Sequence, residues 1–321
     1  MAFRFKTYAA LCLALAAISV SSCGRDGSDD ASVDIRRLDL DISHGHMPED
    51  SLGELAVKRL FEISGYPEAS ESSVSEYAMK PSIHSHVGAV EAEFADMESE
   101  SVALGRVFSS LKRTLPKAEI PELFTIISPF SQSVIVTDSM LYIGLNHYLG
   151  VDYEPYGYFP EYMRHLKVRE RIPVDVAEAI IRTSYPYAPS SDYPRVIGRL
   201  AYEGAVAIAV MSVTGEDAMN VLGYSPEQYR WLKDNERDVW DALISRQLLF
   251  STDASVVRSL VDVGPHSSVI SPDAPGRVGR YVGTSMMQQY VKNNPEVTLE
   301  QLLSPEVYES DDLLTKAGYR P

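Results

Sequence analysis

The sequence is poor in cysteine, with Cys12 and Cys23 as its only two among 321 residues. Cys12 lies in an uncharged run, residues 7–22, that follows Arg4 and Lys6. This pattern is typical of a secretory signal peptide and is too short to span a bilayer as a mature helix. After cleavage no second cysteine would remain. We therefore expect no disulfide, and the mature chain must derive its stability from its core.

The uncharged run ends in small residues followed by a cysteine, VSSC. A lipoprotein signal peptidase would cut before Cys23, and a diacylglycerol would be attached to its thiol. We expect residues 1–22 to be the signal peptide and Cys23 to be the lipidated first residue of the mature chain. The alternative is an ordinary cleaved signal that leaves Cys23 as a free thiol. More than one acyl chain is enough for stable anchoring, so we expect a tethered protein that does not span the membrane.

Positive charge is also scarce, with 29 Lys and Arg against 45 Asp and Glu. Removal of the signal peptide would take away two basic residues and no acidic ones, which gives a net charge of -18. Such a surface argues against binding to nucleic acid and against docking on anionic lipid. The mature chain is long enough for one large domain or two small ones.

Patterning along the first third of the chain predicts a tether followed by mixed structure. Residues 23–34 are mostly Gly, Ser and Asp, which predicts a flexible acidic tether. Residues 33–42 alternate partly and predict a strand, and residues 52–64 predict a short helix. Residues 65–86 are rich in Ser, Glu and Pro and predict a long loop. Residues 87–115 predict one amphipathic helix that ends at Pro116.

Short β-rich runs occupy the middle of the chain, at residues 123–128, 133–138 and 141–145, and predict a small antiparallel meander. Helical patterns then resume in four segments. They are residues 174–183, 196–213, 226–249 and 277–293. We expect one predominantly helical α+β domain over residues 35–321.

A single carboxylate, Glu203, interrupts the apolar run RLAYEGAVAIAV at residues 199–210. An H-E-x-x-H metallopeptidase helix would place histidines at Tyr202 and Val206 and its general base at Glu203. Zinc needs three N, S or O ligands, and valine offers none, so we expect no metal here. An unpaired buried carboxylate costs several kcal/mol, so we expect Glu203 to pair with a basic residue or a tyrosine hydroxyl.

Histidines supply no clear metal or catalytic site. His44 and His46 form one pair, and His84 and His86 form another. Two histidines at this spacing can chelate a metal, but neither pair has a cysteine or a dense carboxylate cluster nearby, which favours surface positions. His266 has serines beside it but no strand-turn-helix nucleophile motif.

Tyrosine is concentrated in residues 141–163, where Tyr153, Tyr156, Tyr158 and Tyr162 fall. These rings could form a wall that stacks on sugars or on a partner peptide. They could equally seal a sheet edge against a loop, with rings buried and hydroxyls in water. Further on, PGRVGRYVG (residues 275–283) contains glycines four residues apart, Gly279 and Gly283, which suits close packing at the start of a helix.

Several stretches in a fixed order carry a family resemblance besides Cys23. They are residues 134–150 with 158–163, residues 202–210, residues 235–253 (NERDVWDALISRQLLFSTD), residues 275–283 and the terminal AGYRP. Together they resemble the gliding motility lipoprotein GldB family of Bacteroidetes over nearly the whole mature chain. That family is similar in turn to zinc peptidases whose helix carries H-E-x-x-H.

The resemblance implies a zincin-like, degenerate metallopeptidase fold whose metal ligands have been lost. Glu203 would retain the vestigial general-base position, and Glu236 would lie nearest to a former third ligand. Family members carry a lysine soon after the glycine of this helix, whereas Ala205 follows Gly204 here. That departure weakens the case for a surviving charged pair at the old site.

The resemblance further implies a lipid-anchored envelope protein linked to gliding motility or type IX secretion. We expect a non-catalytic scaffold or partner-binding component, without cofactor or metal, whose partners are other envelope proteins. We place it on the outer membrane facing the periplasm, with surface exposure as the alternative. Two other functions stay open: a residual zinc metallopeptidase with non-standard ligands, and a glycan-binding lipoprotein that uses the tyrosines.

Overall fold

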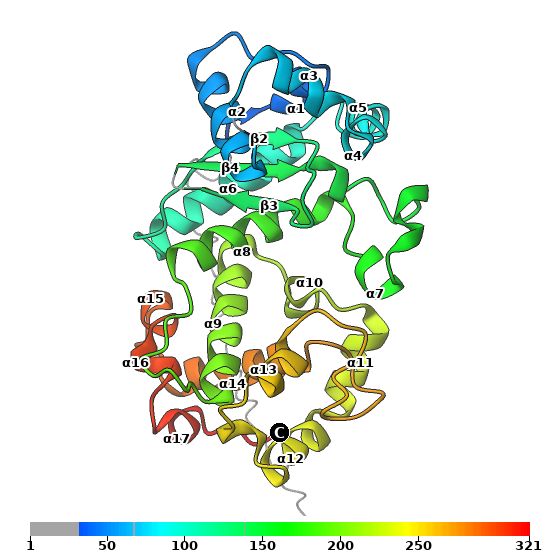
Figure 1. The fold of residues 1–321 in the computed structure, drawn as a ribbon. Coiled ribbons are helices and arrows are strands. Elements are labelled where there is room, and N and C mark those ends of the chain that lie inside the picture. Colours follow the sequence, from blue (N-terminus) through cyan, green and yellow to red (C-terminus); the bar gives the residue numbers. More distant parts are fainter. Residues whose placement is uncertain (1–31, 67, 138) are drawn as a thin grey trace, which may run out of the picture.

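The computed structural model describes residues 32–66, 68–137 and 139–321. The expected signal peptide, the lipidation site Cys23 and nearly all of the expected tether lie outside the described residues. Figure 1 shows two lobes, one above the other. We call residues 32–184 the sheet lobe and residues 196–321 the helical lobe. One continuous cluster of buried apolar side chains runs through both lobes.

In its described residues the sheet lobe contains four strands, with helices between the first and second strands and after the fourth. In chain order these are β1 (Ile35–Arg36), α1 (Leu38–Ile42), α2 (Ser51–Ser64), α3 (Glu71–Met79), α4 (Pro81–His84), α5 (Val87–Glu93), α6 (Glu98–Thr114), β2 (Glu122–Ile126), β3 (Val134–Val136) and β4 (Met140–Gly144). There follow the 3-10 helices η1 (Leu145–His147) and η2 (Glu154–Tyr158), then α7 (Glu161–Arg164), η3 (Arg169–Arg171) and α8 (Ile172–Ser184). Helix α8 lies at the junction of the two lobes (Figure 1).

The sheet is mixed, with strand order β1-β2-β4-β3. β1 and β4 each pair with β2 in parallel, and β3 pairs with β4 in antiparallel fashion. The predicted antiparallel meander is therefore wrong, although three of the strands lie where the sequence placed them. β3 and β4 are consecutive antiparallel strands, so β3 lies within the chain segment that leaves β2 and returns as β4 to pair with it in parallel.

Three local predictions in the sheet lobe are corrected. Residues 33–42 form a two-residue strand and then helix α1, because the short alternation in LDLDI also fits one helical turn. Residues 65–86 contain α3 and α4 instead of a long loop, since Ser70 and Ser73 form a capping box at the start of α3. The predicted helix over residues 87–115 is two helices, separated by residues 94–97.

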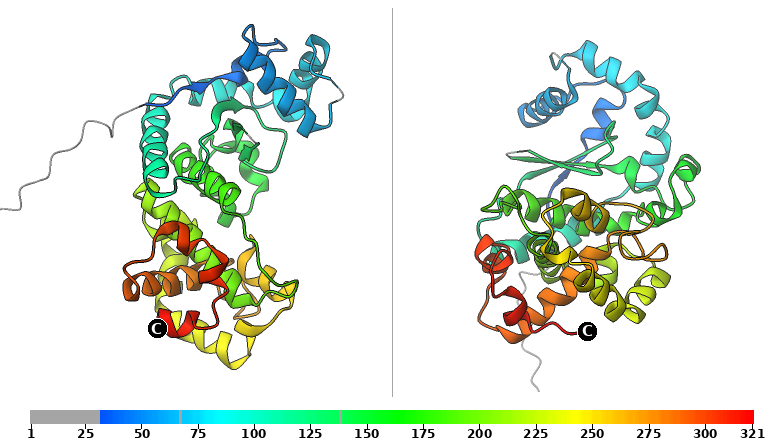
Figure 2. Two further views of the ribbon diagram at one scale, coloured as in Figure 1. Left: turned by 90° about the vertical axis from the view of Figure 1, so that its left-hand side faces the viewer. Right: turned by 60° about the horizontal axis from the view of Figure 1, so that its bottom comes forward.

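The helical lobe contains no named strand in its described residues. It consists of α9 (Val196–Thr214), α10 (Ala218–Leu222), α11 (Pro226–Asp234), α12 (Glu236–Ser245), η4 (Leu248–Phe250), α13 (Ala254–Val261), α14 (Val278–Asn293), α15 (Leu299–Leu302), α16 (Pro305–Tyr308) and α17 (Leu313–Ala317). Helices α10, α13, α15 and α16 pack against α9, and α17 packs against α14. Figure 2 shows the same lobe from two further sides.

The predicted helices over residues 174–183, 196–213 and 277–293 are confirmed as α8, α9 and α14. The segment 226–249 is broken instead at Asn235, whose side-chain amide donates to the Trp231 carbonyl at 2.8 Å. Predominantly helical α+β architecture is thus confirmed.

Helices α9 and α14 approach so closely that glycine is needed at the contact. A Cβ atom on Gly283 would lie 1.9 Å from the Leu200 carbonyl oxygen, and one on Gly204 would lie 2.1 Å from the Gly283 carbonyl oxygen. The expectation that the glycines of residues 275–283 allow close packing is confirmed. This contact fixes the positions of the side chains around Glu203.

Helix α9 is the one helix in the described residues that is long and apolar enough to cross a membrane by length and composition. Most of it is buried in the protein, with 78% of the apolar window inside. Its apolar character is therefore explained by its place in the core.

Candidate functional site

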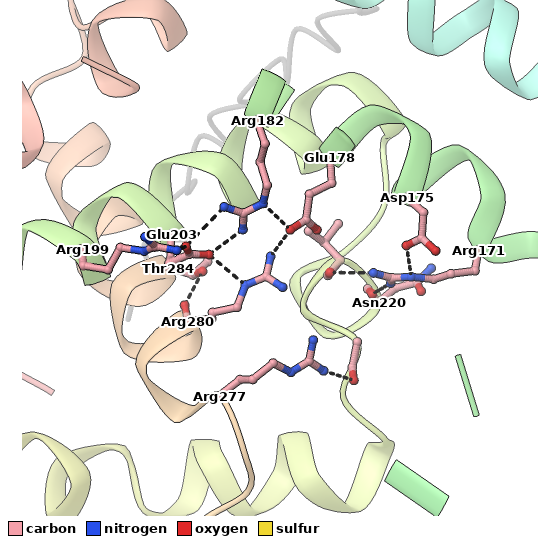
Figure 3. A network of polar contacts seen from close by, with 12 residues as sticks. Arg171, Asp175, Glu178, Arg182, Arg199, Glu203, Asn220, Arg277, Arg280 and Thr284 are labelled. Atoms are coloured by element: carbon pink, nitrogen blue, oxygen red, sulfur yellow. Dashed lines mark hydrogen bonds and ion pairs between the residues drawn. The ribbon is translucent and has the colours of Figure 1, made fainter. Parts of the chain in front are cut away.

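Glu203 lies at the centre of a buried network of charged residues, with 1% of its surface exposed. Three arginines from three helices surround its carboxylate (Figure 3). Arg182 Nη2 of α8 lies 2.5 Å from Oε2, and Arg199 Nη2 of α9 lies 2.9 Å from Oε1. Arg280 Nε of α14 lies 3.4 Å from Oε2. The prediction that Glu203 pairs with a basic residue is confirmed.

Glu178 on α8 is the second carboxylate of this network. Its Oε1 lies 2.8 Å from Arg182 Nε and 2.8 Å from Arg280 Nη2. Arg182 and Arg280 therefore each bridge Glu178 and Glu203. Because these residues come from α8, α9 and α14, the network joins the last helix of the sheet lobe to the centre of the helical lobe.

The same face of α8 extends the network toward the sheet. Arg171 Nε pairs with Asp175 Oδ1 at 2.9 Å and donates through its guanidinium to the main-chain carbonyls of Asn220 and Val221. Asp175 also accepts a hydrogen bond of 2.9 Å from the buried Tyr148 hydroxyl. The face of α8 thus ties the sheet lobe to the α10 segment.

Electrostatics keep Glu203 ionised. Burial alone would raise the pKa of this carboxyl, but the charges of Arg182 and Arg280 and the hydrogen bonds from Arg182 outweigh burial and hold the pKa below its usual range. The pKa of Glu178 is lowered in the same way, with Arg280 and Arg182 as the main opposing charges to burial. A carboxylate saturated by arginine is a poor general base, because taking up a proton would break its ion pairs.

Arg277 stands apart from the ion pairs, at the N-terminus of α14. Its backbone has φ 60°, a left-handed conformation that non-glycine residues rarely adopt. Its Nη2 donates to the Gly223 carbonyl at 3.0 Å, and its guanidinium lies 5.7 Å from the centre of the Tyr224 ring. Burial and the neighbouring charge of Arg280 lower the pKa of Arg277.

The donor set around Glu203 does not fit a zinc ion. Tyr202 donates its hydroxyl to the Tyr185 carbonyl at 2.9 Å, and Val206 is buried among apolar side chains. Glu236, the position implied for a former third ligand, accepts hydrogen bonds from Tyr281 and Tyr319. Within the described ranges, no three His, Cys, Asp or Glu side chains are grouped so that they could hold a metal.

The histidine pairs lie on the sheet lobe and contact other partners. His44 Nε2 lies 2.5 Å from Glu91 Oε1, and His86 Nδ1 lies 2.8 Å from the Tyr153 hydroxyl. His44, His46 and His84 are exposed, as the sequence indicated. In the helical lobe, His266 forms an isolated main-chain bridge with Pro275, and its side chain is exposed.

The tyrosine-rich stretch forms a projecting loop, residues 149–168, which we call the tyrosine loop. A main-chain bridge between Leu149 and Val168 closes its base, and α7 labels it in Figure 1. Tyr158 is 96% exposed, whereas Tyr156 is 3% exposed and donates its hydroxyl to the Asn146 carbonyl at 2.6 Å. Tyr153 and Tyr162 are half-buried. The four candidate tyrosines therefore differ: Tyr156 supports the loop and Tyr158 is presented to solvent.

Two residues that the sequence analysis did not single out, Lys167 near the end of the tyrosine loop and His147 just before the loop, lie close together. Lys167 Nζ is 4.2 Å from the centre of the Phe159 ring and 3.4 Å from His147 Nδ1. Burial and the charge of Lys167 lower the pKa of His147 to about 4, so His147 is neutral at physiological pH. Nothing in the local sequence links these two residues.

The sequence analysis also did not identify the arginines that pair with Glu203. Two four-residue spacings in the sequence could have indicated part of this network. Arg199 precedes Glu203 by four residues, and Glu178 precedes Arg182 by four, which places each pair on one helical face. No local signal connects Arg280 with Glu203, because the two helices meet only in the folded protein.

The fold and the site define a predominantly helical α+β protein whose central carboxylate is sealed in an arginine network. The family model described as gliding motility protein GldB matches residues 25–321. The chain therefore belongs to the GldB family, and the resemblance seen in the sequence is confirmed. The family's name associates it with gliding motility and, in its short form, with lipoproteins. No curated protein and no solved structure matches the chain.

Proposed function

We propose that this chain is a lipid-anchored, non-catalytic component of the cell envelope that binds partner proteins of the gliding or type IX secretion machinery. Cys23 carries the lipid in this proposal, and the zincin-like origin of the fold, with its ligands lost, belongs to it as well. The proposal also places the protein on the outer membrane, facing the periplasm.

The state of Glu203 is the single observation that carries the non-catalytic role. A hydrolytic glutamate must exchange a proton with water or substrate, so it needs access and a pKa near the working pH. Glu203 is fully buried, both of its oxygens bind arginine, and its pKa is lowered. These features support a structural role at the position where a peptidase would hold its base.

Zinc content and peptide hydrolysis test the non-catalytic role. The full chain is purified in detergent with zinc present, dialysed, and compared with Glu203→Gln. We expect far less than one zinc per chain, and no hydrolysis of a casein substrate that differs between the two proteins. One zinc per chain together with hydrolysis that Glu203→Gln abolishes would establish the alternative, a residual metallopeptidase.

Membrane fractionation and cross-linking test the anchor and the partner-binding role. Cys23→Ser should move the protein from the membrane fraction to the soluble fraction. In a gliding host, cross-linking should recover envelope proteins with the wild-type chain. Recovery of none, with the protein at its native level and correctly folded, would refute the partner-binding role.

Glycan binding is kept as a second candidate because Tyr158 of the tyrosine loop is almost fully exposed. An exposed ring of this kind can stack on the apolar face of a sugar. Tyr158→Ala should then weaken binding to envelope polysaccharide while leaving stability unchanged. Equal retention of both proteins on a polysaccharide column would exclude this function.

A further inference from the structure

The tyrosine loop contacts both lobes through histidine. On the side of the sheet lobe, His86 Nδ1 lies 2.8 Å from the Tyr153 hydroxyl. On the side of the helical lobe, His165 Nε2 lies 3.3 Å from the carbonyl oxygen of Gly223, which follows α10. Leu166 packs against the same glycine, since a Cβ atom on Gly223 would lie 3.1 Å from Leu166 Cδ2. The loop therefore bridges the two lobes.

His165 makes two side-chain contacts, and both partners are main-chain carbonyl oxygens. Its Nδ1 lies 3.3 Å from the oxygen of Glu161, four residues earlier, and its Nε2 faces Gly223. A carbonyl oxygen only accepts hydrogen bonds, so each ring nitrogen must carry a hydrogen to bond to it. A neutral imidazole carries one such hydrogen, whereas an imidazolium carries two. Both hydrogen bonds therefore exist together only when His165 is protonated.

Two other histidines at the loop have partners that suit a neutral ring. His147 Nε2 lies 3.1 Å from a main-chain carbonyl oxygen, while its Nδ1 faces the ammonium group of Lys167, which donates. The Tyr153 hydroxyl beside His86 can donate or accept, so this contact exists in either protonation state. Burial lowers the pKa of His86. These two contacts therefore need no protonated ring, whereas the pair of contacts at His165 does.

Charged groups of both signs surround His165. Arg277 of α14 donates to the same Gly223 oxygen at 3.0 Å, and its charge opposes a second cation there. A crevice of about 280 Å³ beside α10 is lined by His165 and by three carboxylates that attract a cation. Burial raises the pKa of Tyr224 in this crevice to about 12, so its hydroxyl stays neutral. The titratable and charged groups that line the crevice or flank His165 in α7 are Glu161, Arg164, Glu170, Arg171, Glu216, Asp217 and Tyr224. Acidic and basic groups nearly balance, so the two carbonyl oxygens are what distinguish the protonated ring.

We propose that the tyrosine loop is a pH-sensitive latch between the two lobes, closed by protonated His165 and released when this ring is neutral. In the closed state His165 donates to Glu161 within the loop and to Gly223 across the lobes. Loss of one proton leaves a nitrogen lone pair facing one of these carbonyl oxygens, so the two bonds no longer form together and the contact with α10 weakens. Histidine changes its charge between about pH 5 and pH 8, so the latch responds in this range.

Release frees the loop on one side only. The main-chain bridge between Leu149 and Val168 still closes its base, and Tyr153 keeps its contact with His86. The loop then moves about its base and carries the exposed Tyr158 with it, while the crevice beside α10 opens. This device needs neither the lipid anchor nor a partner protein, so it goes beyond the proposed function and can fail independently of it.

Amide hydrogen exchange of the tyrosine loop tests the latch in the full chain, purified in detergent. Wild type and His165→Ala are compared at the same pH, because the intrinsic exchange rate itself depends on pH. We expect the loop amides to exchange at least fivefold more slowly in wild type at about pH 5.5, and the two proteins to differ less than twofold at about pH 8. A difference of equal size at both pH values, or none at the lower one, overturns the proposal.

His46→Ala is the matched control, because His46 is exposed on the sheet lobe outside the tyrosine loop. We expect the loop of this variant to exchange as in wild type at both pH values. If its loop loses as much protection at low pH as that of His165→Ala, removal of any histidine charge has this effect and the latch is refuted. Circular dichroism confirms that each variant is folded.

His165→Gln separates the proton from the side chain. Glutamine keeps a neutral N–H donor and does not titrate, so the ratio of loop exchange between His165→Gln and His165→Ala should be the same at both pH values. If this ratio changes with pH as the ratio for wild type does, another group titrates and His165 is not the switch.

Discussion

The centre of the helical lobe and the edge of the sheet differ in how their polar groups are paired. Around Glu203, two carboxylate oxygens meet three guanidinium groups, and the ions are sealed by the contact between α9 and α14. At β3, main-chain donors and acceptors are directed away from the sheet. The comparison teaches that charge buried between α8, α9 and α14 is neutralised by opposite charge, whereas the outer side of β3 has no partner strand in the described residues.

Arg280→Met should break the closed centre most severely. It removes the guanidinium that bridges Glu178 and Glu203 and leaves both carboxylates buried with fewer partners. Loss of one partner of a buried ion pair costs about 3–5 kcal/mol. Urea unfolding, monitored by circular dichroism, measures this loss in the free energy of unfolding. A change as small as that of an exposed control, Arg237→Met, would show that the network adds nothing to stability.

Gly283→Ala tests the close contact that seals the centre. The new Cβ would lie 1.9 Å from the Leu200 carbonyl oxygen, so α9 and α14 would have to separate. We expect a loss of about 3 kcal/mol in the free energy of unfolding. Gly88→Ala is the matched control, since its Cβ meets nothing within 4 Å in helix α5. Equal melting temperatures of the two variants would contradict the contact.

Glu203→Gln tests the charge of the centre without changing its shape. We expect a loss of about 1–3 kcal/mol at neutral pH, because hydrogen bonds to a charged group are replaced by weaker ones. The pKa of Glu203 is lowered in the folded protein, so its contribution is present above the unfolded pKa of about 4.3 and is lost as the pH falls through the folded pKa. The difference between wild type and variant should therefore shrink below pH 4. A difference independent of pH down to acid unfolding would exclude an ionised Glu203.

Proline substitution in β3 tests the other region of the comparison. The Thr137 N–H donates to the Met140 carbonyl, so alternation along the strand points the Ile135 N–H toward β4 and the Val136 N–H away from it. We expect Val136→Pro to cost below about 1 kcal/mol, and Ile135→Pro, which leaves a carbonyl of β4 without its donor, to cost about 1–3 kcal/mol. Thermal unfolding of both variants measures the contrast. Equal losses would mean that the outward side of β3 is also engaged.

The sequence alone predicted the parts of this structure that depend on local patterns. Long apolar helices such as α8, α9 and α14 were placed within two residues, and the need of Glu203 for a basic partner followed from the cost of burying charge. The parallel pairing of β1 and β4 with β2 could not be predicted, because it joins segments far apart in the chain. Helix α3 was missed because serine was interpreted as loop composition, whereas Ser70 and Ser73 cap a helix.

The sequence likewise predicts only part of the site around Glu203. Arg199 lies one helical turn before Glu203, so the sequence spacing alone could have indicated this ion pair. Arg182 and Arg280 come from two other helices, and only the close contact at Gly204 and Gly283 brings them together. Tyr158 and Tyr156 belong to one composition pattern, yet main-chain folding buries one ring and exposes the other.

The three arginines around Glu203 also bear on how this protein can change over time. Histidines at Tyr202 and Val206 would create the H-E-x-x-H spacing, but they would stand beside guanidinium groups that repel a dication. Removing the arginines first would leave Glu203 and Glu178 buried without compensation. Metal binding at this helix therefore has no stable single-step route, because the arginine network would have to be dismantled first.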